Sequence, residues 1–142
     1  MAVVMRTALA IVAALAAAFV LVVAVELLST IVHPTPPDFT GTQEEMCDHV
    51  ARYPQWVLAA VVVAWSGTAW IGVWIATRLG GRTAALVVGL FLLAMVCFNV
   101  AMLPYPTWFK LAMPVCLAAG CWYGLHVAMR DQRRAPAAQG QL

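Results

Sequence analysis

Long apolar runs alternate with short polar breaks along this chain. The runs cover residues 7–32, 56–77, 83–103 and 108–129, and charged side chains are nearly absent from them. A helix needs about 20 apolar residues to cross the roughly 30 Å hydrocarbon layer of a bilayer. The pattern therefore predicts an all-α membrane protein, a four-transmembrane-helix bundle that forms a single domain over residues 1–130.

The first run is unusually long and carries one charge, Glu26. As a helix, Thr7 to Val32 would measure about 39 Å, so it must tilt or project from the bilayer. Arg6 ahead of an alanine-rich stretch resembles a signal peptide, but the run is too long and no small-residue cleavage site precedes a polar segment. We expect an uncleaved first span.

Residues 33–55 form the one sizeable polar segment between the predicted spans. It opens with His33-Pro34-Thr35-Pro36-Pro37, which cannot be helical because proline lacks an N–H and restricts the residue before it. Thr42 and Glu45 then have the spacing of a capping box. The segment predicts a short extracytoplasmic loop helix over about 43–53.

The remaining breaks are short. Residues 78–82 and the Pro104-Tyr105-Pro106 turn separate the later spans, and residues 131–142 read as a polar cytoplasmic tail. Such short connections force neighbouring helices to lie antiparallel and adjacent.

Composition supports lipid as the solvent. The chain is 64% hydrophobic and 10% charged, whereas soluble domains carry about 25% charged residues. No basic stripe is present, which argues against a nucleic-acid partner. The four cysteines form no C-x-x-C motif, as a thiol-redox enzyme would need.

The basic residues predict the orientation. One set of connections holds six of the eight lysines and arginines: Arg6, Arg78, Arg82, Arg130, Arg133 and Arg134. The other set holds Arg52 and Lys110, together with most of the acids. Because basic loops stay in the cytoplasm, we expect a multi-pass protein of the cell inner membrane with N- and C-termini cytoplasmic.

Small residues recur at every fourth position in two predicted spans. The positions expected to mediate helix packing are Ala64, Thr68, Gly72, Ala76, Cys116, Gly120 and Gly124. Such rows let helix backbones approach closely in lipid. They indicate either packing within one bundle or the seam of a homo-oligomer.

Glu26, Asn99 and His33 are the candidate residues for a proton or a ligand. An acid at bilayer depth often marks an ion path or binding site, and Asn99 lies near the same outer end as Glu26. The competing interpretation places Glu26 near the headgroups, hydrogen-bonded to Ser29, Thr30 or the loop. The Asn99 side chain would then form a hydrogen bond between two helices.

No catalytic residue, metal site or cofactor is predicted. His33, Cys47, Asp48 and His49 can bind metals, but their spacing matches no zinc pattern. No nucleophile and base are arranged for catalysis, so we do not expect an enzyme.

Several motifs resemble those of a known group. Glu26, then His33-Pro34-x-Pro36-Pro37-Asp38, and the Asn99 to Phe109 segment with Pro104-x-Pro106-x-Trp108 are its main elements. Over about residues 20–128 the chain resembles a family of small, functionally uncharacterised four-span bacterial inner-membrane proteins. The resemblance implies location and architecture and no activity.

Two functions follow as expectations. The first is a non-enzymatic accessory or assembly protein that packs against a membrane-protein partner through its small-residue rows. The alternative is a small proton-coupled transporter or channel that uses Glu26.

Overall fold

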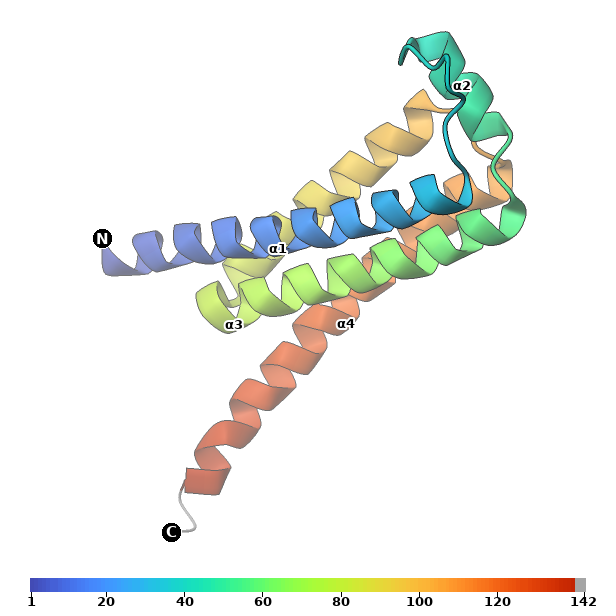
Figure 1. Ribbon diagram of the computed structural model, residues 1–142. Helices are drawn as coiled ribbons and strands as arrows, with labels where there is room; N and C mark the ends of the chain where they lie inside the picture. The colour runs from blue at the N-terminus through green and yellow to red at the C-terminus, as the bar shows by residue number, and fades with distance from the viewer. Residues whose placement is uncertain (140–142) are drawn as a thin grey trace.

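The computed structural model describes the backbone of residues 1–139 and the side chains through Arg134. All regular structure in this part of the chain is helical (Figure 1). The elements are α1 (Ala2–Val32), α2 (Gln43–Ala51), α3 (Gln55–Met102) and α4 (Thr107–Gln139).

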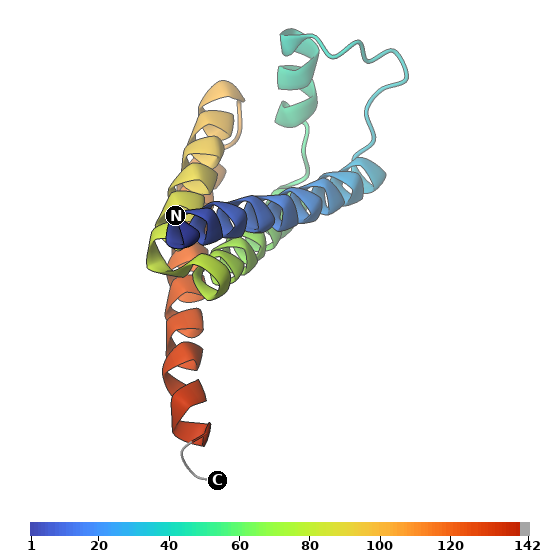
Figure 2. The same ribbon diagram turned by 90° about the vertical axis from the view of Figure 1, so that its left-hand side faces the viewer.

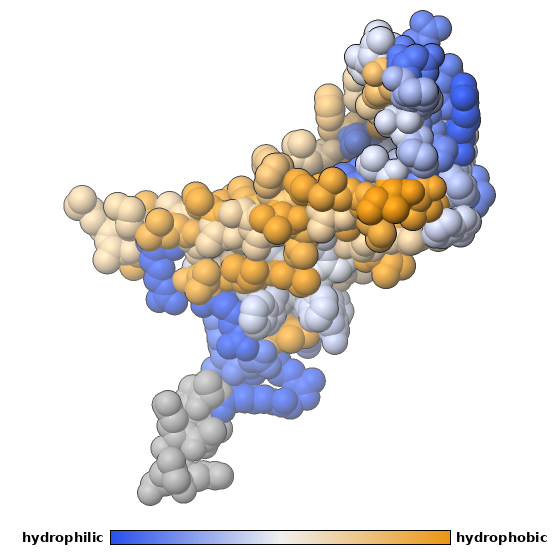
Figure 3. Space-filling model, in the orientation of Figure 1, coloured by the Kyte–Doolittle hydropathy of each residue, from blue (hydrophilic) through white to orange (hydrophobic). Residues whose placement is uncertain are grey.

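Three of these helices are long and apolar enough to cross a membrane. They are α1, α3 and the part of α4 up to Arg134. Apolar side chains cover much of the face seen in Figure 3, and polar ones gather at its two ends, around α2 and along the C-terminal part of α4. This distribution is typical of a protein whose middle lies in lipid.

Helix α3 is interrupted once, at Gly81, whose φ of 78° and ψ of −168° are not helical. A positive φ suits glycine because it has no Cβ to clash with the backbone. The chain reverses direction here, so α3 is a hairpin of two arms, residues 55–80 and 82–102 (Figure 1). The five-residue connection expected over 78–82 is therefore a single non-helical residue.

Helix α4 also extends further than the apolar pattern indicated. Residues 131–139 continue the helix, so the predicted polar tail begins inside α4. Residues 140–142 of that tail lie outside the described part of the chain.

Helix α3 is the centre of the fold. It packs against α1 and against α4, whereas α1 and α4 do not pack on each other within the described residues. One core cluster joins both arms of α3 to α4 through Leu58, Val96 and Leu117, and the other joins α1 to both arms through Ala14, Ala76 and Val88. Helices α1 and α4 are thus held together through α3, which packs against both.

The small-residue rows lie in these contacts. An added Cβ at Gly120 or Gly124 would overlap the backbone carbonyl oxygens of Ser66 and Trp70, so α4 touches the backbone of α3 there. A Cβ at Gly72 would lie 3.5 Å from the Cβ of Ala18 on α1. Both glycine rows pack within the chain.

The rest of the expected packing set lies on the same faces. Thr68 and Ala76 are buried, while Ala64 and Cys116 are half-buried. Helix α1 supplies a third row that sequence reasoning did not single out, formed by Ala10, Ala14 and Ala18, each at most 2% exposed.

Polar contacts tie the N-terminus, the Gly81 turn and the C-terminal part of α4 together. Arg6 Nε donates to the carbonyl oxygen of Leu79 at 2.7 Å, and the Arg78 guanidinium pairs with Asp131 at 2.6 Å. These basic segments therefore share one end of the molecule, as the charge pattern indicated.

The opposite end is capped by α2. The capping box predicted from Thr42 and Glu45 is confirmed, because the Thr42 hydroxyl accepts from the Glu45 N–H and the Glu45 carboxylate accepts from the Thr42 N–H. Figures 1 and 2 both show that α1 and the second arm of α3 diverge toward this end of the molecule, where α2 is also found.

A candidate ligand cavity beneath α2

A cavity of about 310 Å³ lies at the end of the molecule that carries α2, and we call it the outer cavity. All four helices and the 103–106 turn contribute to it. Its polar side chains are Glu26, His49, Tyr53, Trp65, Asn99 and Tyr105. Pockets of this size, mostly apolar with a few converging polar groups, are typical of ligand sites.

Glu26 and Asn99 both line the outer cavity, Glu26 from α1 and Asn99 from the second arm of α3. Both are largely exposed, so they lie at its rim. No hydrogen bond joins the two residues in the described part of the chain, and the Thr30 hydroxyl donates to the backbone carbonyl of Glu26 at 2.9 Å. The Glu26 carboxyl is thus not held by Thr30 and can contact a ligand.

Trp65 forms part of the cavity wall. Its indole Nε1 is buried and has no well-aligned hydrogen-bond partner among the described residues. The Glu26 carboxyl approaches this N–H. A buried donor without a proper partner is costly, so this N–H is suited to an acceptor brought by a ligand.

Aromatic rings form another part of the wall. Tyr105 packs on Phe109 with ring centroids 4.5 Å apart. Burial, with smaller effects of Glu26 and Tyr53, raises the pKa of Tyr105 to about 12, and burial also raises the pKa of Tyr53. Both phenols therefore stay neutral at physiological pH.

The rings of His33, His49 and Tyr53 form a contacting cluster beside the outer cavity. The His33 ring lies 4.4 Å from that of His49 and 4.5 Å from that of Tyr53. His49 and Tyr53 line the outer cavity, and His33 lies outside its lining. Burial, and then the nearby His33 and Arg52, lower the pKa of His49, which favours its neutral form.

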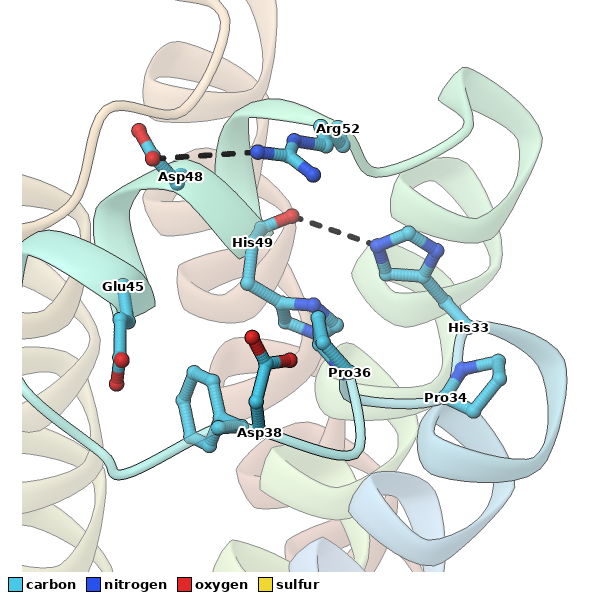
Figure 4. Close-up of a pocket in the computed structure, with 9 residues that line it drawn as sticks. His33, Pro34, Pro36, Asp38, Glu45, Asp48, His49 and Arg52 are labelled. Atoms are coloured by element: carbon cyan, nitrogen blue, oxygen red, sulfur yellow. Dashed lines mark hydrogen bonds and ion pairs between the residues drawn. The ribbon is translucent and has the colours of Figure 1, made fainter.

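A second, open pocket of about 380 Å³ lies beside these rings and is lined in part by His33 and His49 (Figure 4). Asp38, Asp48 and Glu45 line it, and Asp48 pairs with Arg52 at 3.9 Å. The view shows Asp48 turned toward Arg52 and the Asp38 carboxyl turned toward the His49 side. No three histidine, cysteine or acidic side chains come close enough to hold a metal ion within the described residues.

The structure thus brings Glu26 and Asn99 to one cavity and places His33 outside its lining, stacked on His49. Sequence reasoning missed Trp65, Tyr53 and Tyr105 as site residues. The tyrosines lie where an interfacial aromatic belt is expected. Only their proximity to Glu26 in the folded structure indicates that they belong to a site as well as to such a belt.

Comparison of the chain with profiles of protein families, with characterised proteins and with solved structures gives no match.

The stability of the N-terminal capping box of α2 is expected to depend on pH. Hydrogen bonds from the Thr40 hydroxyl, and from the Thr40 and Thr42 amides, lower the pKa of Glu45 from its ordinary value of 4.5. The contribution of Glu45 to the cap is therefore complete above pH 4.5 and is lost as the pH falls through the lower pKa of the folded state. We expect amide hydrogen exchange in the first turn of α2 to accelerate in that acidic range. A Glu45→Gln variant should lack this pH dependence and Glu44→Gln should keep it.

Proposed function

We propose that this chain is a four-span inner-membrane protein with both termini in the cytoplasm, which binds a small ligand through Glu26 in the outer cavity. The two arms of α3 support four spans, because about 26 and 21 helical residues correspond to roughly 39 and 31 Å. The gathering of Arg6, Arg78 and Asp131 at one end supports a common side for the termini and the Gly81 turn.

One observation carries the ligand-binding function. Glu26, Asn99 and Trp65, whose buried N–H has no aligned hydrogen-bond partner, line one cavity of about 310 Å³. Polar groups at this depth are costly unless they serve structure or binding. Within the described residues the Glu26 carboxyl approaches the Trp65 N–H but makes no aligned hydrogen bond with it, so both groups remain available to a ligand.

This geometry favours binding over the two functions expected from sequence. An assembly protein needs a free seam for its partner, but the glycine rows that suggested one pack within the chain. A channel needs a polar path, but the core between α1 and α3 on the inner side consists of Ala10, Ala14, Val73, Ala76, Ala84, Ala85 and Val88. A transporter would bind its substrate in the outer cavity and would have to rearrange this core.

The topology has a direct test. In intact cells, a membrane-impermeant maleimide should label Cys47, which lies on α2, and a Cys47→Ser variant should abolish that labelling. The double variant Cys47→Ser with Gln132→Cys should become labelled only after the cells are lysed, because Gln132 lies at the end expected in the cytoplasm. Labelling of Gln132→Cys in intact cells would contradict the proposed orientation.

Ligand binding is tested by filling the cavity. Val22 lines the outer cavity, so Val22→Phe should exclude a ligand from it. Val20 lies on the same helix but is 66% exposed, outside the described pockets, and Val20→Phe is the matched control. We expect the wild-type protein and Val20→Phe, extracted from native membranes in mild detergent, to carry one small molecule in non-denaturing mass spectrometry.

In the same experiment, Val22→Phe should be extracted without the small molecule. A wild-type protein that carries nothing, or a small molecule that Val22→Phe retains as well as the wild type does, would contradict the proposed function.

A further inference from the structure

A second cavity, of about 330 Å³, continues the outer cavity toward the middle of the helices, and we call it the apolar cavity. Val22, Trp65 and Val96 line both cavities. The apolar cavity is otherwise lined by side chains such as Leu15, Phe19 and Leu117. The two cavities are therefore neighbours, a polar outer one and an apolar inner one, and a single elongated ligand could occupy both.

This site opens sideways between α1 and the second arm of α3. At the outer cavity the exposed rim residues are Glu26 and Asn99. At the apolar cavity they are Phe19, Phe91 and Met95, which are 69%, 50% and 51% exposed. Because the gap lies along apolar helices, its occupant can enter from the lipid without crossing water.

The chemistry of the outer part selects a positive group. Glu26 is its acidic side chain, and no lysine or arginine lines it among the described residues. The rings of Tyr53, Trp65, Tyr105 and Phe109 face the same space. A carboxylate within aromatic walls is the arrangement that recognises an ammonium group, through charge and cation–π attraction.

The junction of the two cavities selects a hydrogen-bond acceptor. Trp65 lines both cavities, and its buried N–H has no aligned partner. A ligand oxygen that follows the ammonium group would accept this hydrogen bond. From the outer end inward, the site therefore calls for a positive group, an oxygen acceptor and an apolar chain.

We propose that this site binds one zwitterionic phospholipid of the membrane, with its ammonium group at Glu26 and the aromatic walls, its phosphate or ester oxygens at the Trp65 N–H, and one acyl chain in the apolar cavity. This inference rests on the proposed function and specifies its ligand. An anionic phospholipid lacks the ammonium group and meets the Glu26 carboxylate instead. A simple alkylamine lacks the acceptor for Trp65.

The test is a competition between two lipids with identical acyl chains. Purified protein is stripped of lipid by detergent exchange, mixed with equal amounts of phosphatidylethanolamine and phosphatidylglycerol, and its bound lipid is counted by non-denaturing mass spectrometry. We expect the wild type to retain phosphatidylethanolamine over phosphatidylglycerol by about tenfold.

Two variants separate the two polar contacts. Glu26→Gln should reduce the preference to about one, because the charge that selects the ammonium group is gone. Trp65→Phe should lower the occupancy of both lipids and leave the preference unchanged, because the oxygen acceptor is common to them. Glu44→Gln, on the exposed face of α2, should behave as the wild type.

A wild type without preference, or a preference that Glu26→Gln leaves intact, would show that the bound lipid is only annular and would overturn the inference. A bound molecule that Val22→Phe removes but whose mass is not that of a phospholipid would also overturn it while leaving the proposed function standing. If the wild type binds nothing in either experiment, both proposals fail.

Discussion

Replacing Gly120 with alanine is expected to destabilise the folded protein by about 3 kcal/mol, the upper part of the usual range for overpacking. The added Cβ would overlap the carbonyl oxygen of Ser66, a backbone atom on α3 that cannot rotate away as a side chain can. Helix α4 must therefore move off α3. Because little hydrophobic force drives helices together in lipid, close backbone contact is a main source of their association.

Gly67→Ala is the matched control. Gly67 also lies within a helix, but nothing lies within 4 Å of the position its Cβ would take. Alanine there should be neutral or stabilise the helix by about 0.5–1 kcal/mol, since glycine is a poor helix former. Thermal unfolding of both variants in the same detergent, followed by circular dichroism, measures the difference. Equal midpoints for the two variants would contradict the packing of α4 on α3.

The fold could be predicted to the extent that hydropathy determines it. Apolar runs indicate which segments are helices, and the Thr42 and Glu45 pair indicates the start of α2, because both are local properties of the chain. The single-residue reversal at Gly81 could not be predicted, because Gly80-Gly81 between two arginines reads equally well as a longer loop. The contact of Gly120 on α4 with the backbone of α3 depends on which helix faces meet, and one sequence does not specify this.

The residues of the candidate site also fall into those that the sequence could predict and those that it could not. Glu26 and Asn99 could be predicted because a polar side chain in an apolar run is conspicuous whatever the fold. Trp65 could not, because tryptophan is compatible with lipid, with a helix interface and with a cavity. The role we propose for Trp65 rests on a buried N–H without an aligned partner where two cavities meet, which is a property of the assembled helices.

Replacing Glu26 with leucine is expected to separate stability from binding. Glu26 lies near the C-terminal end of the apolar helix α1, where an acidic residue is less favourable in lipid than leucine. We therefore expect Glu26→Leu to unfold at the same temperature as the wild type or a higher one. Loss of a hydrogen bond to a charged group costs about 1.5–3 kcal/mol, so the retained ligand should fall by about tenfold or more.

A retained unfolding temperature together with a loss of bound ligand distinguishes a binding residue from a structural one. If Glu26 holds α1 in place, Glu26→Leu should lower the unfolding temperature and release the ligand together. If Glu26 is an interfacial acid without a role, neither quantity should fall. Glu44→Leu, an equal change on the exposed part of α2, should leave ligand retention unchanged. A stable Glu26→Leu protein that releases its ligand therefore supports binding by Glu26, because a misfolded protein would not keep its unfolding temperature.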